Sequence, residues 1–277
     1  MELWLSSAFK SLIEKEDFVD CRVIVESQAF PCHKVMLAAA SDFFKRGFKE
    51  TATGEVHLEN VSADTFKKFR TYIYTYNKDT LAGCNNKSIV KLMECAHMWM
   101  IPSLRKACEE IAVSRINQMV LSDLLIYFDS AFKSGNEYMI THTSQALRNW
   151  CSSQIITDEV YQLESNTFRE VVTRIKGSIS ERVLFDLVEK YVIMQNHFIA
   201  IKDKSSEIEV VDLTETCSSE SLPKKDINEE YVKSLISLIT FTDMTYSEFI
   251  EGPGKSDLIL INDKYQFICK IANPNSS

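Results

Sequence analysis

The segment from Phe18 to Lys49 restricts the possible folds more than any other part of this chain. Apolar residues alternate with polar ones from residue 19 to residue 23, and residue 25 is again apolar, which predicts a short strand. A turn and a second short strand ending at Phe30 follow, and then a compact apolar helix over Val35–Ala40 and a new helix that starts at Ser41. Few folds use two strands and two helices in this order with almost no connecting loop.

The next part of the chain carries a helical pattern. From residue 62 to about residue 196 apolar residues recur at helical spacing, as in Phe66, Phe69 and Ile73. A short strand over Glu55–Leu58 precedes this part, and Pro102 is placed where it would open a helix. Successive apolar faces separated by short breaks predict an array of α-helical hairpins.

The composition changes after residue 198. Residues 202–230 carry four lysines against nine acidic residues, which accounts for −5 of the net charge of −8. A segment with few apolar residues cannot bury enough surface to offset its ordering entropy, so we expect an acidic, disordered linker. Beyond it, Leu258–Ile261 and Tyr265–Ile271 flank a polar Asn-Asp-Lys turn, and this pattern predicts a β-hairpin.

Composition also excludes several classes of function. No apolar run approaches the roughly 18 residues of a membrane span, and the first residues do not read as a signal peptide. The eight cysteines are scattered without a CxxC pair, which indicates reduced, buried thiols and a cytoplasmic or nuclear protein. The negative net charge argues against direct nucleic-acid binding. No HExxH motif, nucleophile elbow or supported carboxylate pair is present, so we expect no catalytic residue, metal or cofactor.

A series of separated positions, taken in order, resembles a BTB/POZ domain. The positions are Leu5, Phe9, Leu12 and Ile13 in an opening helix, Phe18-Val19-Asp20, Phe30, His33-Lys34, Leu37–Phe44, Tyr72–Thr75, Leu92–Ala96 and Leu104–Cys108. The resemblance implies an α+β fold with a BTB/POZ dimerisation domain over residues 1–115 and a helical BACK domain over residues 116–198, as in kelch-like proteins. The disordered linker would then cover residues 199–230, and residues 231–277 would hold the small β-element.

The sequence departs from kelch-like proteins at its C-terminus. Those proteins continue into a propeller, whereas here only residues 231–277 follow the predicted linker. The whole chain has seven glycines and lacks the Gly-Gly pairs of propeller blades. We therefore expect no kelch propeller in this sequence, and the predicted hairpin could be the remnant of one blade.

The resemblance implies two interfaces. Leu5, Phe9 and Leu12 of the opening helix would pack against the same residues of a second copy, although this helix could instead simply cover its own core. Phe48 and Glu50 match the hydrophobic-x-Glu triplet that cullin-3 adaptors carry after the corresponding helix. There the apolar residue fills a pocket of cullin-3 and the acid accepts hydrogen bonds. The alternative is an ordinary helix end with a buried Phe and a solvated acid. His33 matches a buried structural histidine.

A further motif lies in the predicted linker. Val210, Val211, Asp212 and Leu213, within acidic surroundings, look like a SUMO-interaction motif. Such a segment binds by adding a β-strand to the edge of a sheet, with the apolar side chains in a groove and the acids on its basic rim. The alternative is a chance apolar patch in a polar segment.

The resemblance and the linker motif together imply a dimeric, non-catalytic adaptor that recruits targets to a cullin-3 RING ubiquitin ligase, with SUMO binding through the linker. Its partners would be cullin-3, a second copy and SUMO or SUMO-modified proteins. One alternative is a BTB scaffold for transcriptional or chromatin partners without any ligase. Another is an antagonist of kelch-like adaptors that dimerises with them and lacks the propeller.

Overall fold

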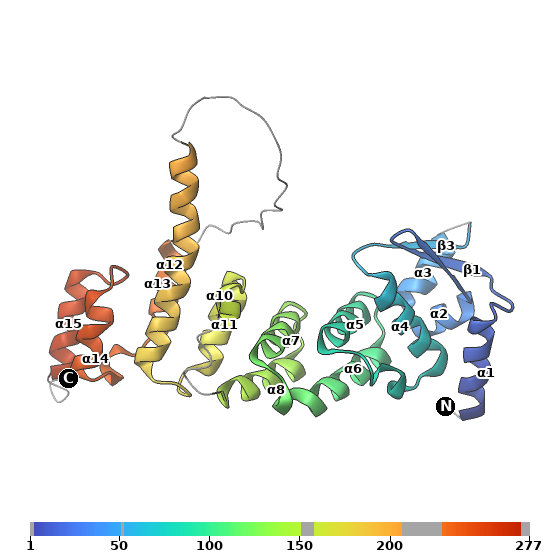
Figure 1. Ribbon diagram of the computed structural model, residues 1–277, viewed down its shortest axis with the longest axis horizontal. Helices are drawn as coiled ribbons and strands as arrows, with labels where there is room; N and C mark the ends of the chain where they lie inside the picture. Colours follow the sequence, from blue (N-terminus) through green and yellow to red (C-terminus); the bar gives the residue numbers. More distant parts are fainter. Residues whose placement is uncertain (1–2, 51–52, 151–157, 207–228, 273–277) are drawn as a thin grey trace. The chain divides into compact units, whose positions relative to one another are not determined.

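The computed structural model describes residues 3–50, 53–150, 158–206 and 229–272 (Figure 1). The chain divides into two compact units, Met1–Thr143 and Ser144–Ser277. The first contains all three strands of the described residues, and the second is helical. This arrangement confirms the predicted α+β class, with a helical region after the N-terminal domain.

The sheet of the first unit has the strand order β2-β1-β3. Strand β1 (Cys21–Val25) pairs antiparallel with β2 (Gln28–Cys32), and it pairs in parallel with β3 (Glu55–Leu58). The predicted alternation is present in β1, because its first, third and fifth side chains are buried. Glu26 has a left-handed φ of 54° in the tight turn to β2. All three strands were expected from the sequence.

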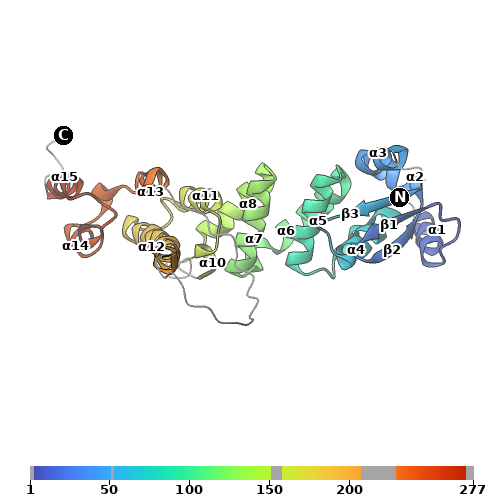
Figure 2. The same ribbon diagram turned by 90° about the horizontal axis from the view of Figure 1, so that it is seen from above.

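Helices surround this sheet and continue the chain (Figures 1 and 2). They are α1 (Leu3–Glu14), α2 (Lys34–Ala40), α3 (Asp42–Glu50), α4 (Ala63–Thr75), α5 (Asn86–Met98), α6 (Pro102–Arg115), α7 (Leu121–Lys133) and α8 (Glu137–Arg148), with short 3-10 turns η1 (Lys78–Leu81) and η2 (Ile116–Gln118). Side-chain caps begin α4 and α5, and a proline in the first turn begins α6. Ser62 Oγ accepts a hydrogen bond from the Thr65 amide, and Pro102 occupies the first turn of α6, as predicted.

An aromatic cluster forms the centre of the first unit. The ring of Phe44 stacks on Phe69 with 5.8 Å between centroids, and it packs against Trp99 at 5.6 Å. Phe66 lies 5.4 Å from Phe69. Phe44, Phe66 and Phe69 are fully buried, so α3, α4 and the end of α5 are locked together around these rings.

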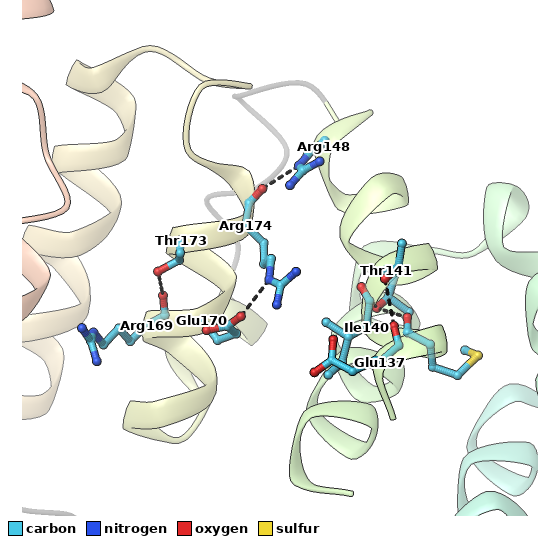
Figure 3. Close-up of polar contacts among 10 residues, drawn as sticks. Glu137, Ile140, Thr141, Arg148, Arg169, Glu170, Thr173 and Arg174 are labelled. Carbon is cyan, nitrogen blue, oxygen red and sulfur yellow. Dashed lines mark hydrogen bonds and ion pairs between the residues drawn. The ribbon is translucent and has the colours of Figure 1, made fainter. Parts of the chain in front are cut away.

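The second unit contains the remaining helices. They are α10 (Asp158–Tyr161), α11 (Ser165–Ile175), α12 (Glu181–Ser206), α13 (Glu229–Ile236), α14 (Tyr246–Glu251) and α15 (Ile261–Ala272), with 3-10 turns η3 (Phe241–Asp243) and η4 (Pro253–Lys255). Figure 3 shows Arg148 donating from Nε to the Arg174 carbonyl at the end of α11, at 2.6 Å. A guanidinium at this position complements the negative end of the helix dipole.

Two predictions for the C-terminal part were wrong. Residues 261–272 form helix α15 and not a β-hairpin, and α12 continues to Ser206, through residues that were predicted to belong to a disordered linker. The hairpin prediction failed because the apolar residues of this short stretch fit a helix as well as two strands. Tertiary packing decides the outcome, since Phe267 of α15 lies 4.7 Å from Phe241. Most of the predicted linker, residues 207–228, lies outside the described residues.

Residues 229–272 pack on α12 and are not an independent element. Arg182 donates from Nη1 to the Glu248 carbonyl at 2.7 Å, and the Thr240 amide donates to Glu181 Oε2 at 2.7 Å. The approach is close at Gly252, where an added Cβ would lie 2.0 Å from Arg182 Nη1. The described C-terminal helices therefore extend the helical unit, rather than forming a separate β-element.

Candidate protein-binding surfaces

The opening helix α1 is attached to its own domain through part of its apolar face. Ile13 is buried, whereas Leu5, Phe9 and Leu12 are half-buried in the single chain. Ser6 Oγ donates to the Thr75 carbonyl at the end of α4, at 3.2 Å. The three predicted interface residues are thus partly covered and keep accessible surface, and their role in a dimer stays a prediction.

Two apolar residues near the opening helix, at the segment before β1 and at the start of α2, are exposed and were not selected from the sequence as interface residues. Phe18 is 86% exposed and Val35 is 70% exposed, so both side chains are accessible to a partner. The segment that carries Phe18 is tied to the start of α2, because Asp20 Oδ1 accepts from the Lys34 amide at 2.7 Å. Phe18 has a left-handed φ of 59°. The residues before β1 were part of the family pattern, but their exposure depends on this local backbone.

His33 holds the same segment from inside the domain. Its Nε2 lies 2.7 Å from the Asp17 carbonyl, which can only accept, so Nε2 carries the proton. Nδ1 then accepts from the Tyr74 hydroxyl at 2.8 Å, and that hydroxyl also accepts from the His33 amide. Burial raises the pKa of Tyr74, so the phenol stays protonated. His33 is 7% exposed, which confirms the predicted buried structural role.

The predicted cullin-binding residues lie at the end of α3. Phe48 is half-buried, and its ring centroid lies 6.4 Å from that of the buried Phe44. Glu50, the last residue of α3, is exposed. Residues two apart on a helix do not share a face, so the two side chains would contact a partner from different sides of the helix end. The ring of Phe48 thus packs on that of Phe44 and keeps part of its surface accessible.

Two exposed methionines are the sequence neighbours of the buried Trp99. Met98 is 46% exposed and Met100 is 49% exposed, and both flank Trp99, whose ring packs against Phe44. Methionine side chains adapt readily to a partner's shape. They were not selected from the sequence, because a methionine at helical spacing is more often part of a core.

The second unit also exposes apolar residues, around α15. An apolar groove of about 390 Å³ lies between α13 and α15 and is lined by Val232, Ile236, Phe241, Leu258 and Phe267 among others. Leu260, which also lines the groove, and the nearby Ile261 and Tyr265 are more than two-thirds exposed. Because the sequence predicted a β-hairpin here, it did not identify this helix face.

The predicted SUMO-binding residues, Val210, Val211, Asp212 and Leu213, lie outside the described residues.

The thiols of the first unit do not have nucleophile character. Burial raises the pKa of Cys21, Cys32 and Cys95 to about 12 in each case, so their thiolates are scarce at neutral pH. Across the described ranges, no group of three His, Cys, Asp or Glu side chains could hold a metal ion. The helices of these ranges also include none that is long and apolar enough to span a bilayer.

Comparisons with known proteins agree with this geometry. A family model of the BTB/POZ domain matches residues 9–116. Kelch repeat and BTB domain-containing protein 2 of Homo sapiens is 30% identical over 151 residues, which are 52% of this chain and 24% of that protein. Kelch-like protein 40 of Mus musculus is 32% identical over 114 residues, 40% of this chain and 18% of that protein.

A longer match reaches into the second unit. Kelch-like protein 40 of Xenopus tropicalis is 23% identical over 242 residues, 84% of this chain and 36% of that protein. The chain thus matches between 18% and 36% of the length of these relatives. Residues 9–116 are a BTB/POZ domain, and over part of its length the chain is similar to kelch-like and kelch repeat and BTB domain-containing proteins.

Proposed function

We propose that this protein is a non-catalytic, dimeric adaptor that recruits targets to a cullin-3 RING ubiquitin ligase. The observation that carries the proposal is Phe48, a half-buried aromatic residue at the exposed end of α3 in a BTB/POZ domain. We place this activity in the cytoplasm or the nucleus. Catalysis would reside in the other ligase subunits. The adaptor would hold the target close to them, and its dimer would add avidity.

The energetic argument for Phe48 rests on how interfaces concentrate their affinity. A few aromatic anchors that enter a partner's pocket carry most of the binding free energy. Phe48 is held by its stacking on Phe44, so little side-chain freedom remains to be lost on binding. The exposed Glu50 can accept hydrogen bonds at the rim.

A titration of the cullin-3 N-terminal domain into the full chain tests this role. Phe48→Ala should weaken binding by about 10- to 100-fold, which corresponds to about 1.4–3 kcal/mol. Glu50→Ala should have a smaller effect, and Arg46→Ala, an exposed change on the same helix, should have little. If Phe48→Ala binds cullin-3 as tightly as the unmodified chain, the assignment is wrong.

The dimer would form through the opening helix and the apolar residues near it. Leu5, Phe9 and Leu12 keep accessible surface in the single chain, and Phe18 and Val35 are largely exposed. Burying about 1,000 Å² or more of such surface is what a stable isologous interface requires. Sedimentation of the full chain should give a dimer, and Phe18→Asp combined with Val35→Asp should weaken it.

The sequence from Val210 to Leu213 supports a second binding activity, towards SUMO. An acidic, β-branched segment of this kind can add a strand to a sheet edge of its partner. Titration of SUMO into the full chain should show binding that is lost in a Val211→Ala, Leu213→Ala variant. Absence of binding to the unmodified chain would remove SUMO from the proposal.

Two competing roles share the same dimer. In the first, the BTB/POZ dimer tethers transcriptional or chromatin partners and does not bind cullin-3, so the cullin titration separates it from the ligase role. In the second, the chain mixes with kelch-like adaptors and antagonises them. Co-purification of differently tagged kelch-like partners with this chain would favour that role.

A further inference from the structure

Two of the buried thiols lie directly opposite each other in the sheet of the first unit. Cys21, the first residue of β1, and Cys32, the last residue of β2, are Cα partners across the antiparallel pair. Their exposed fractions are 6% and 0%, and both thiols are free. Directly opposite partners in an antiparallel ladder point to the same face of the sheet, so the two side chains are neighbours inside the domain.

The spacing of such partners suits a disulfide. Residues directly opposite each other have Cα atoms about 4.5–5.5 Å apart, which lies within the span of about 4.4–6.8 Å that disulfides bridge. Their Cβ atoms are about 4.5–5.5 Å apart, whereas a disulfide needs about 3.5–4.5 Å, so the two strands must approach each other slightly. A disulfide that forms against such resistance is readily reduced again, which is the behaviour of regulatory rather than structural disulfides.

The cysteine pair lies beside the contact between the segment that carries Phe18 and the start of α2. The Asp20 amide donates to the Cys32 carbonyl at 3.2 Å, and Asp20 Oδ1 accepts from the Lys34 amide at 2.7 Å. The left-handed backbone of Phe18 is strained, so its segment should be among the first parts of the domain to open. A covalent bond between the two cysteines would hold this segment in place.

We propose that Cys21 and Cys32 are a redox-sensitive pair, whose oxidation to a disulfide fixes the Phe18 segment to the start of α2. The oxidant is a small disulfide such as glutathione disulfide. One cysteine thiolate attacks it and releases a first glutathione, and the other cysteine then displaces the second glutathione from the mixed disulfide. The pair loses two electrons and two protons, and the two released glutathione thiols carry them. The inference does not rest on the proposed ligase role.

The reaction requires local opening of the hairpin, because both thiols are buried in the closed domain. Burial raises the pKa of Cys21 and Cys32 to about 12, although the neighbouring Arg70 guanidinium favours the Cys32 thiolate. Strand β2 is an outer strand in the order β2-β1-β3, so it can separate from β1 while β1 stays paired with β3. Oxidation is therefore slower than that of an exposed thiol, and its rate follows the opening of β2.

Peptide mass spectrometry of the full chain tests the pairing, after incubation with either reduced glutathione or glutathione disulfide. Once free thiols have been blocked, the oxidised sample should contain a disulfide between Cys21 and Cys32 as its main intramolecular bond, and dithiothreitol should remove it. In the oxidised chain, hydrogen exchange at the amides of residues 18–20 and 33–35 should slow by about tenfold or more, because the closed loop resists local opening.

Two variants separate this pair from the other thiols. Cys21→Ala removes one sulfur, so glutathione disulfide should no longer slow the hydrogen exchange of these residues. Cys95→Ala is the matched control, since Cys95 is a buried thiol in α5, outside the sheet, and both effects should persist in it. The inference is overturned if the unmodified chain forms no disulfide between Cys21 and Cys32, or only mixed disulfides with glutathione. It is also overturned if the disulfide forms and leaves the exchange unchanged.

Discussion

The two units each contain an aromatic cluster, and the clusters differ in depth. In the first unit Phe44, Phe66 and Phe69 are fully buried and come from two helices that are separated by strand β3. In the second unit Phe241 and Phe249 are buried, but Phe267 of α15 is only half-buried. The aromatic core of the BTB/POZ domain is therefore fully buried, whereas the aromatic core of the C-terminal helices is covered on one side by the surface helix α15.

Removal of the fully buried Phe44 ring should show the largest effect on stability. Phe44→Ala would leave a cavity beside Phe69 and Trp99, and we expect a loss of about 3–5 kcal/mol in the free energy of unfolding. Urea denaturation followed by fluorescence of the buried Trp99 measures it. A loss below about 1 kcal/mol would show that the cluster relaxes and is not a closed core.

Phe267→Ala should cost less, because its ring is half-buried and the helix around it can adjust. We expect about 1–3 kcal/mol, with the loss confined to the second unit. Hydrogen exchange would localise the change to α13–α15. An Ile261→Ala control, at a position that is 82% exposed, should stay within about 0.5 kcal/mol.

A substitution at Gly252 tests how α14 is attached to α12. A Cβ there meets the Arg182 guanidinium, so Gly252→Ala must displace it from the Glu248 carbonyl. The loss of this charged hydrogen bond should cost about 1.5–3 kcal/mol. Gly83→Ala is the matched control, because no atom lies within 4 Å of a Cβ at that position. Equal stabilities of the two variants would show that Arg182 does not hold α14.

An exposed substitution in the first unit should change association rather than stability. Phe18→Asp places a residue that tolerates left-handed backbone at φ 59°, so stability should change by no more than about 0.5 kcal/mol. The proposed dimer should nevertheless weaken, and sedimentation would report it. Loss of the folded domain in this variant would instead assign Phe18 to the core.

The smallest effect concerns pH and the start of α14. Hydrogen bonds from the Thr245 amide and hydroxyl hold the pKa of Glu248 below its ordinary value. A lowered pKa in the folded state means that this stabilisation is present at neutral pH and is lost as the pH falls through the folded pKa. The stability gap between the unmodified chain and Thr245→Ala should therefore narrow in acid. A gap that stays constant would exclude a role for the carboxylate.

The sequence alone predicted the strands, the helices of the first unit and the buried His33, because alternation and helical spacing there agree with the capping residues. It did not predict the exposure of Phe18, which depends on a left-handed backbone, or of Met98 and Met100, which resemble core positions. The failure at α15 has a different cause. Over so short a segment its apolar residues fit the periodicity of a strand as well as that of a helix. The helix is favoured by tertiary packing of Phe267 against the rings of Phe241 and Phe249.

The most direct test of the adaptor role is the composition of the complex with cullin-3. Sedimentation of the full chain mixed with the cullin-3 N-terminal domain should give two chains with two cullin domains, because each BTB/POZ domain of the dimer presents its own Phe48. Phe48→Ala should leave a dimer of the chain without cullin-3. A chain that remains a monomer and does not bind cullin-3 at any concentration would contradict the account.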